Sequence, residues 1–173
     1  MGLAMNGWLA GKRARIEGDA PAITAAIEAA GAVLVADGEG DCDIWVHIAP
    51  HSEIKRAHEI GYSEWRANLD AGLDRRFLGA QKFAAECRKR GRGGAVLFVG
   101  APEQALGADH AAAAGALGNL TKTLGVEWAR DGIRVNSILT RTSEETLGHL
   151  AAYLVSDYAA YVTGAVMGVD LDD

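Results

Sequence analysis

Hydrophobic residues recur along this chain with two spacings, one typical of helices and one typical of buried strands. Within residues 109–128, leucines at positions 117, 120 and 124 recur every three or four residues, which predicts a helix with one apolar face. The pair Asp131-Gly132 supplies a left-handed turn that ends this helix. Residues 133–139 carry Ile133, Val135 and Ile138 and favour an extended, half-buried strand.

The same patterns predict the other elements. Strands are expected at residues 9–16, 32–40, 43–49 and 93–103, with a further strand at the C-terminus. Helices are expected from Pro21 to Gly31, from Glu64 to about Arg90, and after Ser143. Strands that alternate with helices predict a parallel sheet. We therefore expect one α/β domain over residues 1–173, with a Rossmann-like, doubly wound, mainly parallel sheet of about six strands.

Polar residues before the helices are the expected caps. Asp19 is expected to cap the helix that Pro21 opens, and Ser63 and Ser143 are expected to cap the later helices. The helix over residues 64–90 is expected to bury one face, which consists of Trp65, Leu69, Leu73, Phe77 and Ala80.

The link between Asp37 and the strand at residues 43–49 is unusually short. An extended link of this length reaches roughly 25 Å, whereas passing one strand and descending another requires roughly 19 Å. The connection is feasible but taut, and the alternative is a second strand that is displaced or pairs differently. In both cases one sheet face lacks a helix. Parallel sheets are normally covered on both faces, so we expect a partner chain to shield it.

Composition narrows the class of protein. The chain has 173 residues, 49% of them hydrophobic, a net charge of −6 and a pI of about 5.3. Its basic residues are scattered apart from one helix-end cluster, which argues against nucleic-acid binding. Cys42 and Cys87 lie far apart without a pairing motif. No apolar run approaches membrane length, and no signal-peptide layout is visible. We expect a cytoplasmic protein with no membrane partner.

Two segments carry a resemblance to a known family. GNLTKTLGVEWARDGIRVNSI (residues 118–138) resembles the part of short-chain dehydrogenases/reductases that follows their active-site Tyr-x-x-x-Lys and contains Arg-Val-Asn. AAYLVSDYAAYVTGAVMGVD (residues 151–170) resembles the last helix, loop and strand of that family. The resemblance covers most of the chain and implies a truncated Rossmann domain. In relatives, the C-terminal unit and the two long helices build the subunit contacts.

The resemblance fails at the positions that define the family's activity. The tyrosine position is His110, the lysine position is Ala114, and the serine that orients the substrate carbonyl is replaced by Gly100. Alanine cannot lower the pKa of a proton donor or hold a nicotinamide ribose. Asn68 matches the asparagine of the family's catalytic helix, and it is equally well explained as a residue that bends a helix.

The expected dinucleotide loop is also altered. Gly18 is followed directly by Asp19, Ala20 and Pro21, so the two further glycines that admit a pyrophosphate are absent. A carboxylate at Asp19 would repel a phosphate. Asp37 matches the acidic residue that binds the adenosine ribose in NAD-using relatives, but acidic residues are common at turns. We therefore predict no catalytic residue, no cofactor-binding residue and no cofactor.

Other candidate sites have simpler explanations. His47 and His51 could ligate a metal with Asp41 or Asp43, but they flank a strand end and need not converge, so no metal ligand is predicted. Neither cysteine has a fixed basic neighbour that would activate it. Trp45 and Trp128 are expected to be core or interface anchors.

Two functions follow from these observations. The first is a non-catalytic subunit, similar in kind to the inactive subunits of heteromeric short-chain dehydrogenases, which stabilises or shapes an active NAD(P)-dependent dehydrogenase acting on a hydroxyacyl or ketoacyl (CoA) substrate. The small residues of 111–118 suit close helix packing at such an interface, with an active subunit or with a second copy of the chain. The alternative is an enzyme or ligand binder with a repurposed cleft, using His47, His51 and His110, or an NAD(P)-dependent oxidoreductase with an atypical site.

Overall fold

The computed structural model describes residues 7–50, 53–100, 107–140 and 145–169. Its elements, in chain order, are β1 (Arg13–Glu17), α1 (Pro21–Ala29), β2 (Val33–Leu34), β3 (Ile44–Ile48), α2 (Tyr62–Leu69), α3 (Arg75–Arg90), β4 (Gly94–Gly100), α4 (Ala108–Glu127), β5 (Ile133–Thr140), α5 (Glu145–Val155) and β6 (Val166–Val169). Among the described residues, no helix is both long enough and apolar enough to cross a bilayer.

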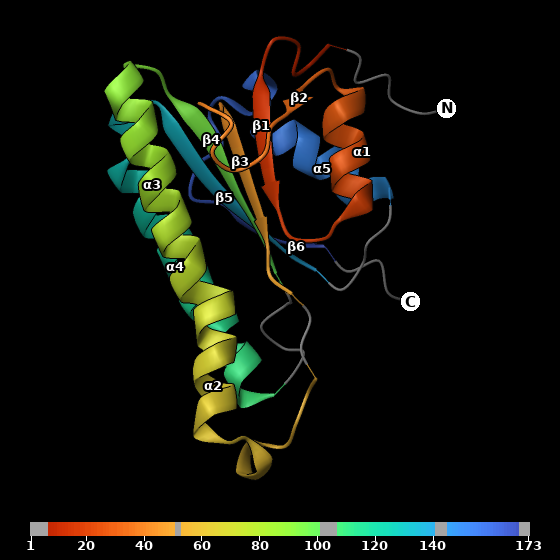
Figure 1. Cartoon of the computed structure of the whole chain (residues 1–173), viewed down its shortest axis with the longest axis vertical. Coiled ribbons are helices and arrows are strands. Elements are labelled where there is room, and N and C mark those ends of the chain that lie inside the picture. The colour runs from red at the N-terminus through yellow and green to blue at the C-terminus, as the bar shows by residue number, and fades with distance from the viewer. Residues whose placement is uncertain (1–6, 51–52, 101–106, 141–144, 170–173) are drawn as a thin grey trace.

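The strands form one parallel sheet in the order β2-β1-β3-β4-β5-β6 (Figure 1). This confirms the predicted doubly wound sheet of six strands. β2 pairs with β1 on the side opposite to β3, so the short link after β2 does pass β1. The second strand is therefore not displaced, but it contains only two residues, fewer than the sequence pattern predicts.

Helices cover both faces of this sheet. α1 and α5 pack against each other on one face, and α3 and α4 lie on the other (Figure 1). β3 is buried along its whole length: Ile44, Val46 and Ile48 belong to the core under α1 and α5, and Trp45 belongs to the core under α3 and α4. Burying each such side chain contributes roughly 1.5–3 kcal/mol, so β3 anchors both layers.

α2 and α3 are joined through a π-helical stretch, Asp70–Asp74, into one long rod. Two details of the prediction for this rod are wrong. Gly61, not Ser63, is the N-cap. The buried side chains of α3 are Arg76, Ala80, Phe83, Ala84 and Cys87, so Ala80 is buried as predicted, whereas Phe77 is 39% exposed. The wider π turn shifts the register of the helix faces, which a constant 3.6-residue period does not anticipate.

The other helix ends follow the predictions in part. Pro21 occupies the first turn of α1 as expected, but the N-cap is Ala20 and it makes no side-chain cap bond, so Asp19 is not a cap. Asp19 lies one residue too early in the chain to serve. Gly132 adopts the left-handed conformation with φ of 70°, as predicted. Ser143 lies outside the described residues, as does the predicted extension of β4 beyond Gly100.

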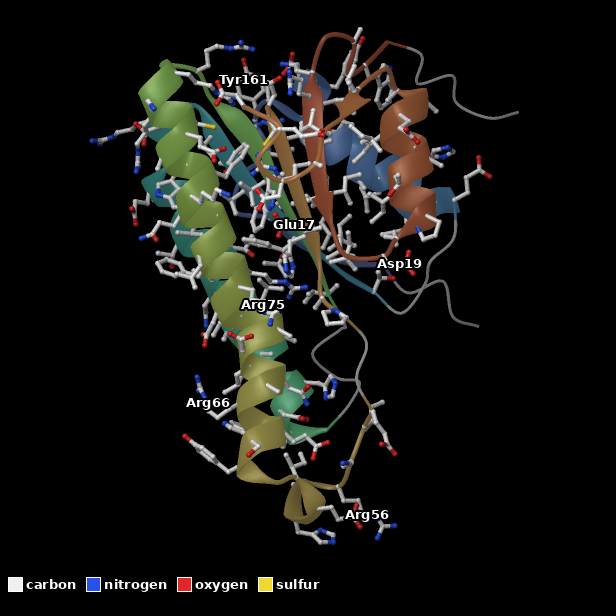
Figure 2. The ribbon with its side chains drawn as sticks, in the orientation of Figure 1. Glu17, Asp19, Arg56, Arg66, Arg75 and Tyr161 are labelled. Atoms are coloured by element: carbon white, nitrogen blue, oxygen red, sulfur yellow. The ribbon has the colours of Figure 1, made fainter. Side chains whose placement is uncertain are left out.

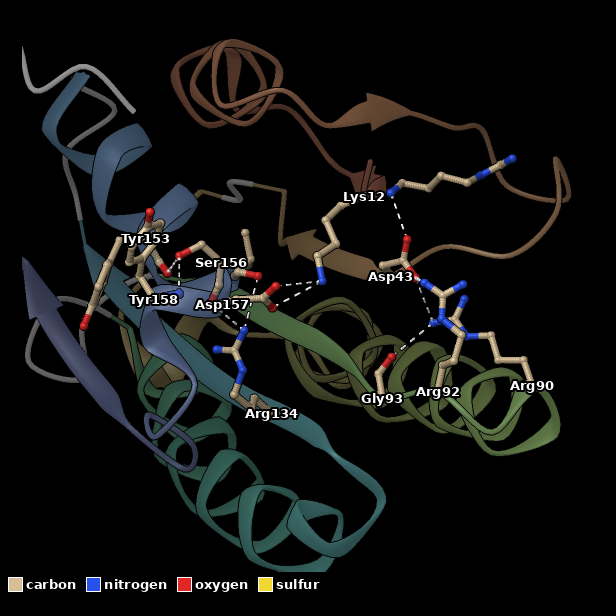
Figure 3. Close-up of polar contacts among 12 residues, drawn as sticks. Lys12, Asp43, Arg90, Arg92, Gly93, Arg134, Tyr153, Ser156, Asp157 and Tyr158 are labelled. Carbon is tan, nitrogen blue, oxygen red and sulfur yellow. Dashed lines mark hydrogen bonds and ion pairs between the residues drawn. The ribbon is translucent and has the colours of Figure 1, made fainter. Parts of the chain in front are cut away.

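The Arg-Val-Asn segment of β5 fastens the C-terminal unit to the sheet. Arg134 donates to the backbone carbonyls at the end of α5, including that of Ser156 at 2.9 Å (Figure 3). The amide of Asn136 donates to the Val162 carbonyl at 2.9 Å and accepts from the Ala165 N–H at 3.0 Å. The Arg134 bonds satisfy carbonyls that α5 leaves unpaired at its C-terminus, and the Asn136 bonds hold the segment before β6.

Candidate functional site

The carboxyl ends of the strands are where ligands bind in open α/β sheets. A buried arginine, Arg76 of α3, lies at the ends of β3 and β4 and is only 2% exposed. Its Nη1 donates to the Gly72 carbonyl at 3.0 Å, its Nη2 donates to the Val99 carbonyl, and its Nε donates to Nδ1 of His47 at 3.4 Å. Arg76 therefore joins the helical rod to both strands.

The guanidinium of Arg76 fills the space beside Gly100. A Cβ atom added to Gly100 would lie 3.2 Å from both Nη1 and Nη2 of Arg76. Gly100 is the position that corresponds to the family's carbonyl-orienting serine. A fixed cation thus occupies the space into which a side chain at this position would extend.

Burial lowers the pKa of both His47 and Arg76. Burial and, to a smaller extent, the nearby charge of Arg76 together lower the pKa of His47 to about 4. Burial lowers the pKa of Arg76 to about 10. His47 is therefore neutral at physiological pH and accepts the Arg76 proton through Nδ1. A neutral His47 has no second proton to give as an acid at this pH.

A second cluster joins α2 to the first turn of α4. Nδ2 of Asn68 donates to Oδ2 of Asp109, and Oδ1 of Asp109 lies 2.9 Å from both the backbone N and Nδ1 of His110. Burial raises the pKa of Asp109, but hydrogen bonds from Asn68 and His110 outweigh this effect and hold it below its ordinary value. An ionised Asp109 orients the His110 ring, an arrangement that suits proton transfer.

The predicted tyrosine and lysine positions are one helical turn apart on α4. His110 is partly buried, and Ala114 is buried with 6% exposure. The small residues of this helix lie on two different sides of it. Ala113 packs inward, where its Cβ lies 2.9 Å from the position that a Cβ on Gly72 would take. Gly115 points outward, and an added Cβ there would meet nothing within 4 Å.

The turn from β1 to α1 does not fit a dinucleotide pyrophosphate. The space next to Gly18 is filled, because a Cβ added there would lie 2.3 Å from the Ile48 carbonyl oxygen. Gly18 has φ of +104°, a conformation that favours glycine. The turn itself therefore explains this glycine, without a bound dinucleotide. The Asp19 carboxylate lies beside this turn (Figure 2), whereas Oε1 of Glu17 accepts from Nε1 of Trp45 at 2.8 Å on the α3 side of the sheet. Asp19 would repel a phosphate at the start of α1.

Asp37 is also engaged elsewhere. Its Oδ1 lies 3.0 Å from Nζ of Lys82 and 3.5 Å from Nη1 of Arg15, and the hydrogen bond from Lys82 lowers its pKa. A hollow of about 280 Å³ does lie between β1, α1 and β2, lined by Ile16, Gly18, Thr24, Leu34, Val35 and Ala36. Its lining contains no charged group that would hold a ribose or a phosphate.

The remaining candidates are structural. No three histidine, cysteine or acidic side chains among the described residues lie close enough together to hold a metal ion. His51 lies outside the described residues. Cys42 and Cys87 are free and buried in the core under α3 and α4, where burial raises the pKa of each thiol, that of Cys42 to about 11. Trp45 and Trp128 belong to the same core, as predicted.

Sequence reasoning missed Arg76 and Asp109. The pattern placed Phe77, not Arg76, on the buried face, because it did not include the π stretch. The sequence pattern indicates Asp109 only as the start of a helix. The adjacent Asp109-His110 pair at a helix N-terminus, together with the matched Asn68, was the available signal for this cluster.

The fold and the site define a class of protein: a single Rossmann-type domain with the layout of short-chain dehydrogenases/reductases. Residues 10–142 match the family described as enoyl-(acyl carrier protein) reductase, and the chain belongs to this family of short-chain dehydrogenases/reductases.

Similar proteins are dehydrogenases. The chain is 29% identical to 3beta-hydroxysteroid dehydrogenase 1 of Eggerthella lenta over 76% of its own length and 63% of that protein. It is 26% identical to glucose 1-dehydrogenase 2 of Bacillus subtilis over 76% of its own length and 64% of that protein. It is 28% identical to cis-4-hydroxycyclohexanecarboxylate dehydrogenase of Sinomonas cyclohexanicum over 76% of its own length and 65% of that protein. The chain thus spans 63–65% of the length of these relatives.

Solved structures agree on the fold. A short-chain type dehydrogenase/reductase from Mycobacterium marinum superposes with a TM-score of 0.81 at 20% identity, over 96% of each chain. An acetoin dehydrogenase from Salmonella typhimurium superposes with a TM-score of 0.80 at 21% identity, over 92% of this chain and 96% of that chain.

Proposed function

We propose that this chain is a non-catalytic member of the short-chain dehydrogenase/reductase family that assembles with an active NAD(P)-dependent dehydrogenase subunit and stabilises or shapes its site. The observation that carries the proposal is the Arg76 guanidinium beside Gly100, which fills the space of the family's serine. Two further observations support the proposal: alanine, not lysine, stands at position 114, and the Asp19 carboxylate lies beside the β1–α1 turn.

The proposed interface is formed by the long helices and the C-terminal unit. Gly115 supports this choice, since its outward side is open to at least 4 Å within the chain and admits a close approach by another helix. A second copy of the chain could use the same face and form a homodimer. For the active partner we propose an acyl thioester as substrate class, hydroxyacyl or ketoacyl, because the matched family is described by an acyl-carrier reaction.

Co-expression with a dehydrogenase encoded beside it tests the assembly. We expect the two chains to co-purify, and Gly115→Leu to abolish co-purification while the isolated variant stays folded. Glu28→Leu, at an exposed position of α1 on the other layer, is the matched control and should leave co-purification intact. A Gly115→Leu variant that assembles normally, or a wild-type chain that never co-purifies, contradicts the proposal.

Calorimetric titration with NADH and NADPH tests the non-catalytic part. We expect binding no tighter than millimolar for the isolated chain, because no described group is placed to hold a pyrophosphate. Micromolar binding of either cofactor would contradict the proposal that the chain is non-catalytic.

The contact of 2.9 Å between Asp109 and His110 favours a second candidate, an oxidoreductase or other enzyme that uses His110 as its acid or base. This reading predicts NAD(P)H-dependent turnover of a carbonyl substrate that is lost in His110→Gln. Turnover that survives His110→Gln would exclude this role.

A further inference from the structure

We draw no further inference here: the strongest candidate, the surface patch on the segment that joins α5 to β6, where Tyr158 and Tyr161 are exposed, carries no proposal because nothing in the structure shows what covers it.

Discussion

The contact between Arg76 and His47 places two titratable side chains in the interior and leaves only one of them charged. His47 has a pKa of about 4 in the folded chain, well below its ordinary value of 6.5. Between these two pH values the unfolded chain binds a proton that the folded chain does not. Stability attributable to His47 is therefore fully present above pH 6.5 and is lost as the pH falls toward 4.

We expect this loss to reach about 1.4 kcal/mol per pH unit in that window. Replacing His47 with Asn keeps an acceptor for Arg76 and removes the titration. Urea unfolding at several pH values should show the steeper decline in the wild type, while carboxylate titration affects both proteins equally. Parallel pH dependences in the two proteins would show that His47 is not the group responsible.

Arg76 and Gly100 should also be coupled in energy. Gly100→Ser forces the guanidinium to move from its three partners, and we expect a loss of about 1–3 kcal/mol in the free energy of unfolding. In an Arg76→Met background, Gly100→Ser should lower the free energy of unfolding by less, because the guanidinium that would clash with the serine is absent. A double-mutant cycle measures this difference. Additive effects would mean that the two residues do not share the space.

At the scale of elements, the π stretch of the rod meets α4 at Gly72. An added Cβ would lie 2.9 Å from Cβ of Ala113, so we expect Gly72→Ala to destabilise the chain by about 1–2 kcal/mol. Gly115→Ala on the facing helix meets nothing and should stabilise by about 0.5–1 kcal/mol, since it removes a mid-helix glycine. Denaturant midpoints of the two isolated variants should move in opposite directions; a shift in the same direction would be inconsistent with this packing.

The elements were predictable where side-chain period and turn residues agree. Ile133, Val135 and the turn at Gly132 define β5 and its start, and the alternation in β3 places its residues on both faces. The buried face of α3 was not predictable, because the π stretch depends on contacts with α4 that have no local sequence signature. The site was predictable only at positions fixed by the family pattern: His110, Ala114 and Gly100 could be placed, whereas Arg76 and Asp109 depend on tertiary contacts.

At the scale of the whole molecule, the rod extends beyond the carboxyl edge of the sheet (Figure 1). α3 lies over the strands and buries five side chains, whereas α2 packs on α4 and has no fully buried residue. Amide hydrogen exchange should therefore be faster in α2 than in α3, although both belong to one continuous helix. Equal protection along the rod would indicate that it opens as a single unit.

Such a gradient makes the end of the rod a separate opening unit, a foldon that can melt while the sheet stays intact. Asn68 lies in that unit and donates to Asp109 of α4, next to His110, whereas Arg76 lies beside the anchored strands. A molecule that docks at the tip could reorder the first cluster at a small fraction of the global unfolding energy. The arginine beneath would stay in place throughout.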